Sequence, residues 1–283
     1  MDPAKRKLYI IAAASFIALL AAVYFLFIFQ KKPKAPKPGE TTGEVQQLAD
    51  IELAKRPHIT MTPTADGAEI IISIENMANF DRIDYELTYL ADNPQALGEK
   101  ITRGATGTDV NTRDDKYKKS ILLGTASRGV RSPDKGIADG KLAMHLFKDD
   151  TEYLSETNWD LLEVSASTQV LKDRTGNLQI ENLSLGKNYW VIIADTVGLP
   201  EGQKEFDHKN VIGPNYGVFS IAPEFVKPAD LSITLSANPT QAFLYSFSNR
   251  DSSWKKVESS YDPSNKTISA KVNSLAAFVV TSQ

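Results

Sequence analysis

The chain has 283 residues, a formal net charge of −3 at neutral pH and no cysteine. The lack of cysteine excludes disulfides and thiol catalysis, and it argues against a zinc site. Residues 1–47 hold seven of the 32 basic residues but only three of the 35 acidic ones. The rest of the chain is therefore acidic, and because nucleic-acid binding normally needs a basic face, we predict no nucleic-acid partner.

Residues 8–29, LYIIAAASFIALLAAVYFLFIF, form an unbroken apolar stretch without a charged residue, proline or glycine. As an α-helix this stretch would be about 33 Å long, enough to cross a hydrocarbon core of about 30 Å. Aromatic residues lie towards both ends, where their rings favour the lipid headgroups. We predict a single transmembrane helix that contacts the bilayer through residues 8–29. Its predicted anchor positions are Leu8, Tyr9, Phe16, Leu20, Tyr24 and Phe29.

A cleaved signal peptide is the main alternative for this stretch. A signal peptide has an apolar region of about 7–15 residues followed by a small-residue cleavage site. The stretch here is longer and ends in Phe27-Ile28-Phe29-Gln30, so we expect it to be retained. Basic residues flank it on both sides and do not fix its orientation. Because a long domain translocates largely regardless of flanking charge, we expect residues 1–7 to be a cytoplasmic tail and the body to be extracytoplasmic.

Residues 30–47, QKKPKAPKPGETTGEVQQ, are predicted to be a linker. Three prolines favour an extended, stiff first half, and Gly39 and Gly43 allow more freedom in the second. The lysines of this linker can lie against anionic lipid headgroups or simply be solvated.

Alternating hydrophobicity predicts β-strands from Ile51 onward. In residues 68–75 one strand face carries Ala68, Ile70, Ile72 and Ile74, and residues 83–89 and 141–147 show the same period of two. Turn residues such as Asp66-Gly67 and Asp139-Gly140 separate these segments. Residues 48–163 are therefore predicted to form a first antiparallel β-sandwich.

A second series of short strands follows. The segments are 164–171, 177–181, 189–194, 216–221, 231–235, 242–247, 254–258, 267–272 and 276–280. Their spacing predicts a second antiparallel sandwich over residues 164–283. The fold class we expect is thus all-β, with two tandem sandwich domains that meet around residues 158–166. A single larger sandwich is the alternative.

The C-terminal stretch from KPADLSITL to NSLAAFVV resembles a terminal module of bacterial surface proteins. The resemblance rests on an aromatic-rich strand (243–247), a Trp after a short polar turn (Trp254), an Asp-containing turn (262–265) and two closing strands. It covers about 55 residues. It implies an Ig-like or fibronectin-like sandwich and no catalytic activity.

More widely, the segments FDRIDYELTY (80–89), SILLGT (120–125) and GPNYGVF (213–219) carry a second resemblance. The chain resembles uncharacterised single-pass membrane proteins of candidate-phyla bacteria with small genomes. This resemblance implies a location and an architecture, not an activity.

Patterns for catalysis or metal binding are weak. His58, His145 and His208 are far apart in the sequence and lack metal-ligand spacing, so we expect them in turns or on the surface. The pairs Asp114/Asp115 and Asp149/Asp150 are expected in solvated turns, although a calcium site there stays open. Tyr and Trp residues could stack on sugars, but core packing is the expected role. We therefore predict no catalytic, metal or cofactor-binding residues and no cofactor.

The sequence favours a non-enzymatic protein of the bacterial cell envelope with a structural, adhesive or binding role. Its expected partners are the lipid bilayer and an envelope protein or glycan. Two other functions stay open. One is an accessory subunit of a membrane complex, since the apolar stretch contains a set of alanines suited to helix packing. The other is an enzyme acting on envelope polysaccharide, which would require two facing carboxyl groups in a cleft.

Overall fold

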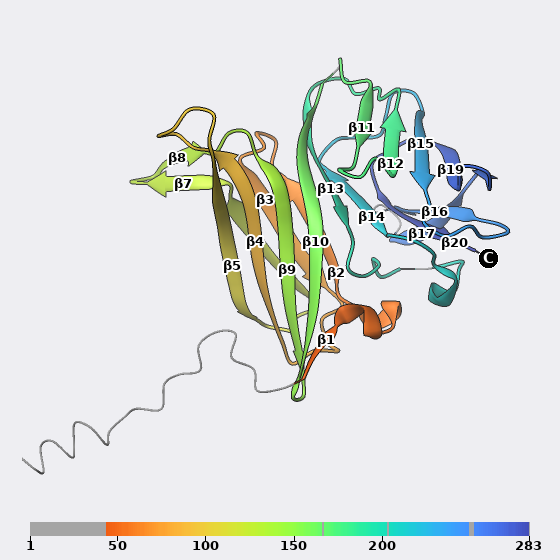
Figure 1. Ribbon diagram of the computed structural model, residues 1–283, viewed down its shortest axis with the longest axis horizontal. Coiled ribbons are helices and arrows are strands. Elements are labelled where there is room, and N and C mark those ends of the chain that lie inside the picture. The colour runs from red at the N-terminus through yellow and green to blue at the C-terminus, as the bar shows by residue number, and fades with distance from the viewer. Residues whose placement is uncertain (1–43, 166, 203, 249–251, 283) are drawn as a thin grey trace, which may run out of the picture. The chain divides into compact units, whose positions relative to one another are not determined.

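The computed structural model describes residues 44–283 except 166, 203, 249–251 and 283, and only the backbone of residue 109 (Figure 1). This part of the chain is all-β, with only three short 3₁₀ helices: η1 (Leu48–Asp50), η2 (Leu53–Lys55) and η3 (His208–Asn210). Within it no helix is long and apolar enough to span a membrane. The predicted transmembrane helix 8–29, its anchor positions and the tail 1–7 lie outside the described residues.

One large sheet runs through the described chain. Its strand order is β17-β16-β20-β14-β13-β10-β9-β4-β5, and all of these neighbours pair antiparallel. The bounds are β4 (Arg82–Asp92), β5 (Lys100–Val110), β9 (Ala138–Lys148), β10 (Thr151–Val164), β13 (Tyr189–Asp195), β14 (Tyr216–Ser220), β16 (Phe243–Ser248), β17 (Ser253–Val257) and β20 (Ala277–Thr281). We call it the shared sheet.

Smaller sheets pack on the shared sheet. The three-stranded sheet has the order β2-β3-β6, and the five-stranded sheet has the order β11-β12-β15-β19-β18. Their bounds are β2 (His58–Pro63), β3 (Glu69–Glu75), β6 (Lys116–Leu122), β11 (Val170–Lys172), β12 (Leu178–Glu181), β15 (Ala229–Thr234), β18 (Ser259–Asp262) and β19 (Thr267–Val272). A separate hairpin of β7 (Gly124–Ser127) and β8 (Val130–Pro133) projects from the body (Figure 1).

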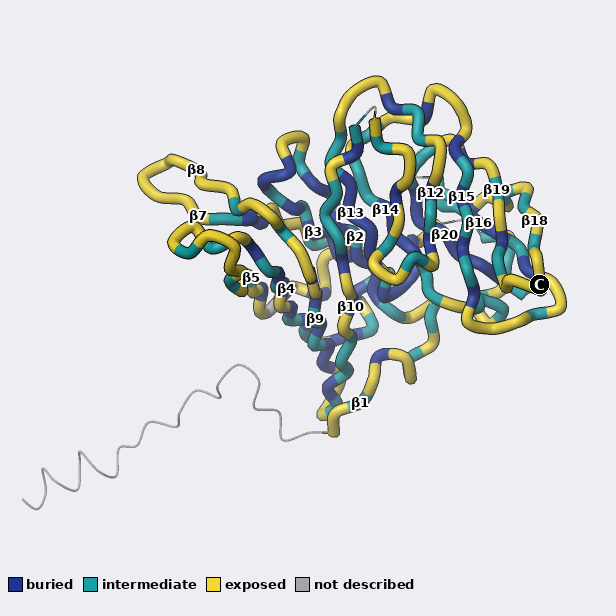
Figure 2. The backbone as a smooth tube through the Cα atoms, turned by 45° about the horizontal axis from the view of Figure 1, so that its top comes forward, coloured by how far each residue is buried: buried dark blue, intermediate teal, exposed yellow. Residues whose placement is uncertain are grey.

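The two smaller sheets cover opposite faces of the shared sheet, as alternate residues of β13 show. Ile192 and Ala194 belong to the core cluster that includes Ile70, Ile72 and Ile74 of the three-stranded sheet. Val191 and Ile193 belong to the cluster that includes the five-stranded sheet. Because β13 is buried on both faces, its sequence YWVIIAD is a nearly continuous apolar run rather than an alternating one. Figure 2 shows this buried backbone at the centre of the body.

A third cluster lies at the far end of the shared sheet. Leu199, Tyr245, Trp254, Ala277 and Val279 form it, with Phe206 packed against them. The Trp254 indole N–H donates to the Pro200 carbonyl at 3.2 Å, which satisfies its buried donor. Leu199 and Phe206 thus cover this end of the shared sheet.

Most predicted strands are confirmed. Ile70, Ile72 and Ile74 are fully buried, and Ile83, Tyr85, Leu87 and Tyr89 of β4 all face a core. The predicted strand 164–171 is wrong, because β10 ends at Val164 and β11 begins only at Val170. Between them Thr168 N–H donates to the Ser165 carbonyl, and the Thr168 hydroxyl accepts from Ser165 N–H. Such local hydroxyl bonds compete with strand pairing.

The domain boundary predicted between residues 163 and 164 falls at the end of β10. Residues 159–164 of β10 pair with residues 189–194 of β13, so one sheet continues across this point. The two main core clusters divide close to it, since Trp159 belongs to one and Val164 to the other. The division into two tandem domains, and the Ig-like topology of the second, stay predictions.

Strand β1 (Val45–Gln47) lies in the last part of the predicted linker 30–47. It pairs parallel with β10, with Val45 opposite Glu152. The Glu152 N–H also donates to the Glu44 carbonyl at 3.0 Å. The body therefore begins beside the first residues of β10, at the same end of the sheet as Arg82 of β4.

Candidate functional site

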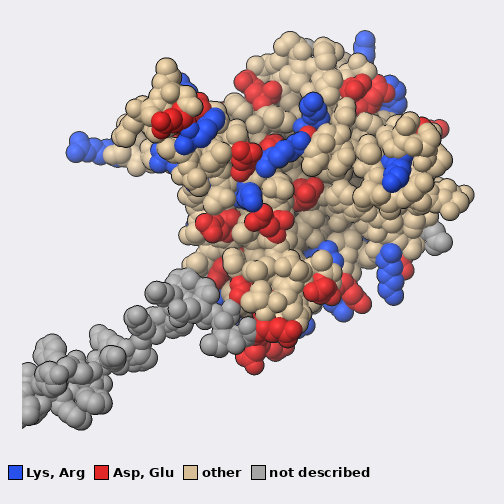
Figure 3. Space-filling model, viewed as in Figure 1, with Lys and Arg blue, Asp and Glu red and all other residues tan. Residues whose placement is uncertain are grey.

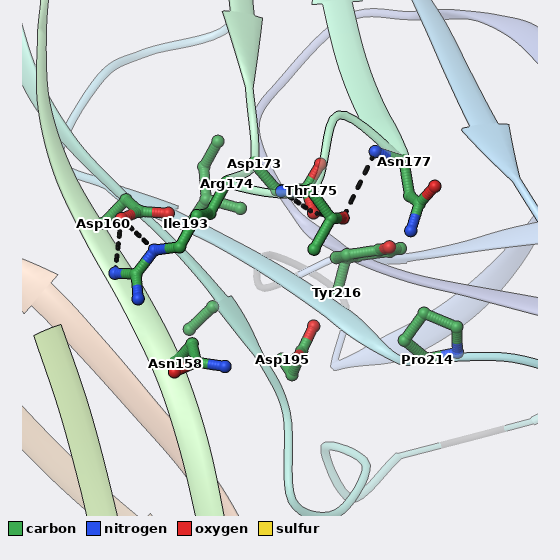
Figure 4. Close-up of a pocket in the computed structure, with 11 residues that line it drawn as sticks. Asn158, Asp160, Asp173, Arg174, Thr175, Asn177, Ile193, Asp195, Pro214 and Tyr216 are labelled. Atoms are coloured by element: carbon green, nitrogen blue, oxygen red, sulfur yellow. Dashed lines mark hydrogen bonds and ion pairs between the residues drawn. The ribbon is translucent and has the colours of Figure 1, made fainter. Parts of the chain in front are cut away.

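The candidate site is a pocket at the corner where the β11–β12 turn meets the shared sheet (Figure 4). Its cavity volume is about 130 Å³. The turn contributes Asp173, Arg174 and Thr175, and the shared sheet contributes residues from β10, β13 and β14. The lining from the sheet includes Asn158, Asp160, Ile193, Asp195 and Tyr216. We call this the corner pocket.

Arg174 ties the turn to the shared sheet. Its guanidinium donates to the Asp160 carboxylate at 2.7 and 3.1 Å and to the Trp159 carbonyl at 3.1 Å. Asp139 on β9 lies 3.8 Å from the same guanidinium. A guanidinium held by several acceptors has little orientational freedom. Arg174 therefore fixes the pocket wall and neutralises Asp160.

Asp173 shapes the turn itself. Its carboxylate accepts the Leu178 N–H at 2.8 Å and the Thr175 N–H at 3.3 Å, and it also accepts the Thr175 hydroxyl. Gly176 follows with φ of +74°, a conformation that glycine adopts without strain. The sequence Asp-Arg-Thr-Gly forms this turn because an Asp side chain bonds the backbone two residues on.

Asp195 is the carboxylate whose ionisation the pocket disfavours. It is the last residue of β13 and lies across the pocket from the turn (Figure 4). Burial raises its pKa, and the nearby carboxylates of Asp173 and Asp160 raise it further. The pKa of Tyr216 is also raised, first by burial and then by Asp173 and Asp195. The pocket thus favours a ligand that donates hydrogen bonds or carries positive charge.

The shared sheet has an uncovered polar face that leads to the corner pocket. Side chains of β4, β9 and β10 that point to this face form ion pairs: Arg82–Asp84 at 3.4 Å, His145–Glu152 at 2.6 Å and Lys141–Glu156 at 2.8 Å. Acidic and basic side chains are interspersed on the molecular surface shown in Figure 3. No large basic area appears on that face, in keeping with the acidic composition.

The three histidines are not brought together. His145 pairs with Glu152, and His208 lies in η3 with its Nε2 2.9 Å from the Lys204 ammonium. Burial and then Lys204 lower the His208 pKa. The surface position expected for His58 is wrong: His58 is only 4% exposed, because β2 packs on the shared sheet and the Gly198 carbonyl lies 3.3 Å from its Nδ1. Burial lowers the His58 pKa to about 4.

The other sequence candidates lie apart from the pocket. Asp114, Asp115, Asp149 and Asp150 are exposed in turns, as predicted. In the described part of the chain, no group of three His, Cys, Asp or Glu side chains has an arrangement that could hold a metal ion.

Of the aromatic residues considered as a stacking platform, Tyr85 and Tyr89 pack inside the body, while Tyr189 and Trp190 are partly buried. Tyr85 and Tyr89 are 2% and 4% exposed, and their rings make edge contacts with Tyr117 and Trp159. The Trp190 ring covers Gly67 so closely that a Cβ there would lie 2.4 Å from it. Core packing is therefore confirmed for Tyr85 and Tyr89.

Sequence reasoning missed the corner pocket. Asp160, Asp173 and Asp195 are separated by more than ten residues each and share no motif. The only local signal was the Asp-Arg-Thr-Gly turn, which marks a hairpin but not a binding site. No protein-family model matches the chain, and no curated protein is significantly similar to it.

Proposed function

We propose that this chain is a single-pass protein of the bacterial cell envelope, held in the membrane by residues 8–29, whose β body binds a partner outside the membrane without enzymatic activity. In this proposal residues 1–7 are cytoplasmic and the second half of the body is Ig-like. The uncharged 22-residue apolar stretch supports the membrane location. The binding role is carried by one observation, the corner pocket, in which an apolar floor is ringed by carboxylate and amide side chains.

The pocket chemistry defines a ligand class. The cavity volume of about 130 Å³ is below the roughly 300–1,000 Å³ typical of pockets for drug-sized ligands. The carboxylates of Asp173 and Asp195 and the amides of Asn158 and Asn177 line it. We propose that it takes one hydroxyl- or amine-bearing group, such as a terminal sugar of an envelope glycan.

A glycan microarray probed with the full chain in detergent tests this proposal. We expect binding to a subset of glycans, and loss of that binding in a variant carrying Asp195→Asn and Asn177→Ala. The matched control is Asp114→Asn, which removes a carboxylate from an exposed turn. Binding to no glycan, or binding that the pocket variant retains, would refute the assignment of the pocket.

One observation favours a second candidate function, the hydrolysis of an envelope polysaccharide. The carboxylates of Asp160, Asp173 and Asp195 share the corner pocket, and glycoside hydrolases use a pair of carboxyl groups that flank the bond they cleave. If this candidate is correct, bound glycans are cleaved and Asp195→Asn abolishes cleavage while binding persists. Intact glycan after prolonged incubation would rule it out.

A further inference from the structure

Strand β5 is an open edge of the shared sheet. It pairs with β4 on one side, and no other described strand pairs with it. Soluble proteins usually protect such edges with charges, prolines or very short strands, because an open edge pairs readily with another chain. The regular part of β5, residues 100–107, ends at a register shift opposite Ile83 and Tyr85. It is the longest open edge in the described part of the chain.

Two other edge strands carry the usual protection by charges. Strand β17, at the opposite edge of the shared sheet, has five residues and includes Lys255 and Lys256. Strand β6 carries Lys116, Lys118 and Lys119. In β5, by contrast, residues 104–107 are Gly-Ala-Thr-Gly, without a charge or a long side chain. Residues 104–107 of β5 therefore lack the charges that protect β17 and β6, and this part of the edge can pair with another strand.

The glycines of β5 are required by close contacts with β4, and they leave the edge without side chains at two positions. A Cβ at Gly107 would lie 2.2 Å from the Tyr85 ring, and one at Gly104 would lie 2.7 Å from the Leu87 carbonyl. Neither position can therefore carry a side chain without displacing β4. A backbone without side chains is accessible to close approach by another strand.

We infer that β5 is a homotypic docking edge, through which two copies of this chain pair antiparallel over residues 101–107 about a two-fold axis at Gly104. This register places Thr102 of each copy opposite Thr106 of the other, on the uncovered face of the sheet. Facing threonine pairs stabilise antiparallel strands. An axis one residue earlier would place Arg103 opposite itself, and like charges directly opposite are destabilising.

The charges near this edge are compatible with self-pairing. Lys100 is paired with Asp92 at 2.7 Å, and Arg103 lies 3.6 Å from Asp134. In an antiparallel pair about Gly104 the two Lys100 residues lie at opposite ends, whereas the two Arg103 residues are diagonal neighbours, each held beside its own Asp134. A single strand pair buries a small interface and is weak. Many copies on one surface add their pairings and strengthen the contact.

The β7–β8 hairpin adds contact area beside the edge. It projects past β5 in both Figure 1 and Figure 2. Its turn residues Arg128 and Gly129 have φ of 51° and 80°, as in a tight two-residue hairpin turn. Arg131 holds the hairpin to Glu69 at 2.6 Å, while Val130 near the tip is 70% exposed. An exposed valine on a fixed arm offers the second copy an apolar contact.

The antiparallel pairing about Gly104 fixes how far apart the two copies of Val45, in strand β1, lie. Gly104 lies level with Thr88, Lys141 and Asn158 across the shared sheet, whereas Val45 lies level with Glu152. Asn158 is six positions beyond Glu152, which is about 20 Å at 3.3 Å per residue. The two-fold axis therefore places the two Val45 residues about 40 Å apart along the strands, at opposite ends of the pair. Given the proposed anchor at residues 8–29, this arrangement allows the pair to join two opposed membranes.

Cross-linking of the full chain in detergent tests the pairing. Because the chain has no cysteine, Thr102→Cys and Thr106→Cys variants each carry one thiol. Residues directly opposite in an antiparallel pair have Cα atoms about 4.5–5.5 Å apart, within disulfide range. We expect a disulfide-linked dimer under mild oxidation when the two variants are mixed. Each variant alone should give little dimer, because its two thiols lie about 13 Å apart along the strands.

Vesicle clustering tests the joining of membranes. We expect the wild-type chain to cluster vesicles, and we expect loss of clustering in a T102K/T106K variant and in a T102E/T106E variant. Mixing vesicles of these two variants should restore clustering, which a folding defect could not do. The same two lysines placed at the exposed Thr240 and Gln241 are the control and should leave clustering unchanged.

Each result has a separate meaning. Failure of the mixed cysteine variants to cross-link would overturn the β5 pairing. Cross-linking without clustering by vesicle-bound chain would overturn the opposed-membrane geometry. If the chain does not float with vesicles in a density gradient, the proposed anchor fails, while the cross-linking result still decides the pairing.

Discussion

Two adjacent residues of β13 allow us to measure whether the two main core clusters unfold together. Ile192 and Ile193 are both fully buried, but they face different core clusters. Replacing either isoleucine by alanine removes three carbon atoms, worth about 2.4 kcal/mol at roughly 0.8 kcal/mol each. The cavity left behind brings the expected loss in the free energy of unfolding to about 3–4 kcal/mol.

Both variants should lower the midpoint of a single unfolding transition, because β13 belongs to both cores and the shared sheet is continuous. For a body of this size the melting temperature should fall by roughly 6–16 °C. The assay is denaturation of the full chain in detergent, followed by circular dichroism and by tryptophan fluorescence. Trp159 reports one core and Trp254 reports the third cluster.

The matched control is Val226→Ala, because Val226 is 76% exposed. Its effect should stay within about 0.5 kcal/mol. Two separate transitions, with Ile192→Ala shifting only one of them, would refute the coupling and favour two independent domains.

Three further predictions concern single sites. Asp195→Asn should stabilise the protein at neutral pH, because the raised Asp195 pKa means that folding disfavours its charged form. This gain in stability should vanish below about pH 4, where the carboxyl is protonated in both the folded and the unfolded state. A series of urea midpoints at different pH values measures the gain. The buried His58 has a pKa of about 4, so stability should fall as the pH drops from about 6.5 to about 4, by about 3 kcal/mol. This slope should disappear in His58→Gln, and an unchanged slope would refute its assignment to His58. Gly107→Ala should lower the free energy of unfolding by about 1–3 kcal/mol, because its Cβ would meet the Tyr85 ring. Gly186→Ala, with open space around it, should leave the free energy of unfolding nearly unchanged. Thermal denaturation measures both.

The sequence predicted strands where its own residues alternate between apolar and polar. Residues 70–74 of β3 and residues 83–89 of β4 alternate between apolar and polar, and both strands form as expected. Strand β5 gave no such signal, because its inward residues include the small Ala105, opposite Leu87, and Gly107, against the Tyr85 ring of β4. Packing by the partner strand, rather than its own hydrophobicity, places β5 in the sheet.

The boundary near residue 163 was hard to locate for a physical reason. In β10, Trp159 faces one core and Val164 faces the other, so the apolar positions change faces within a single strand. The corner pocket was equally hidden. Its carboxylates come from β10, a turn and β13, and only the pairing of β10 with β13 brings them together. Such juxtapositions depend on topology, which local sequence patterns do not encode.

Cell fractionation tests the central claim most directly, namely that residues 8–29 hold this β body at the membrane on its outer side. We predict that the intact chain stays with the membranes after alkaline carbonate washing, and that protease added outside the cytoplasmic membrane digests the body. Recovery of the intact chain in the aqueous fraction would contradict the account, as would a body that protease reaches only after the membrane is broken.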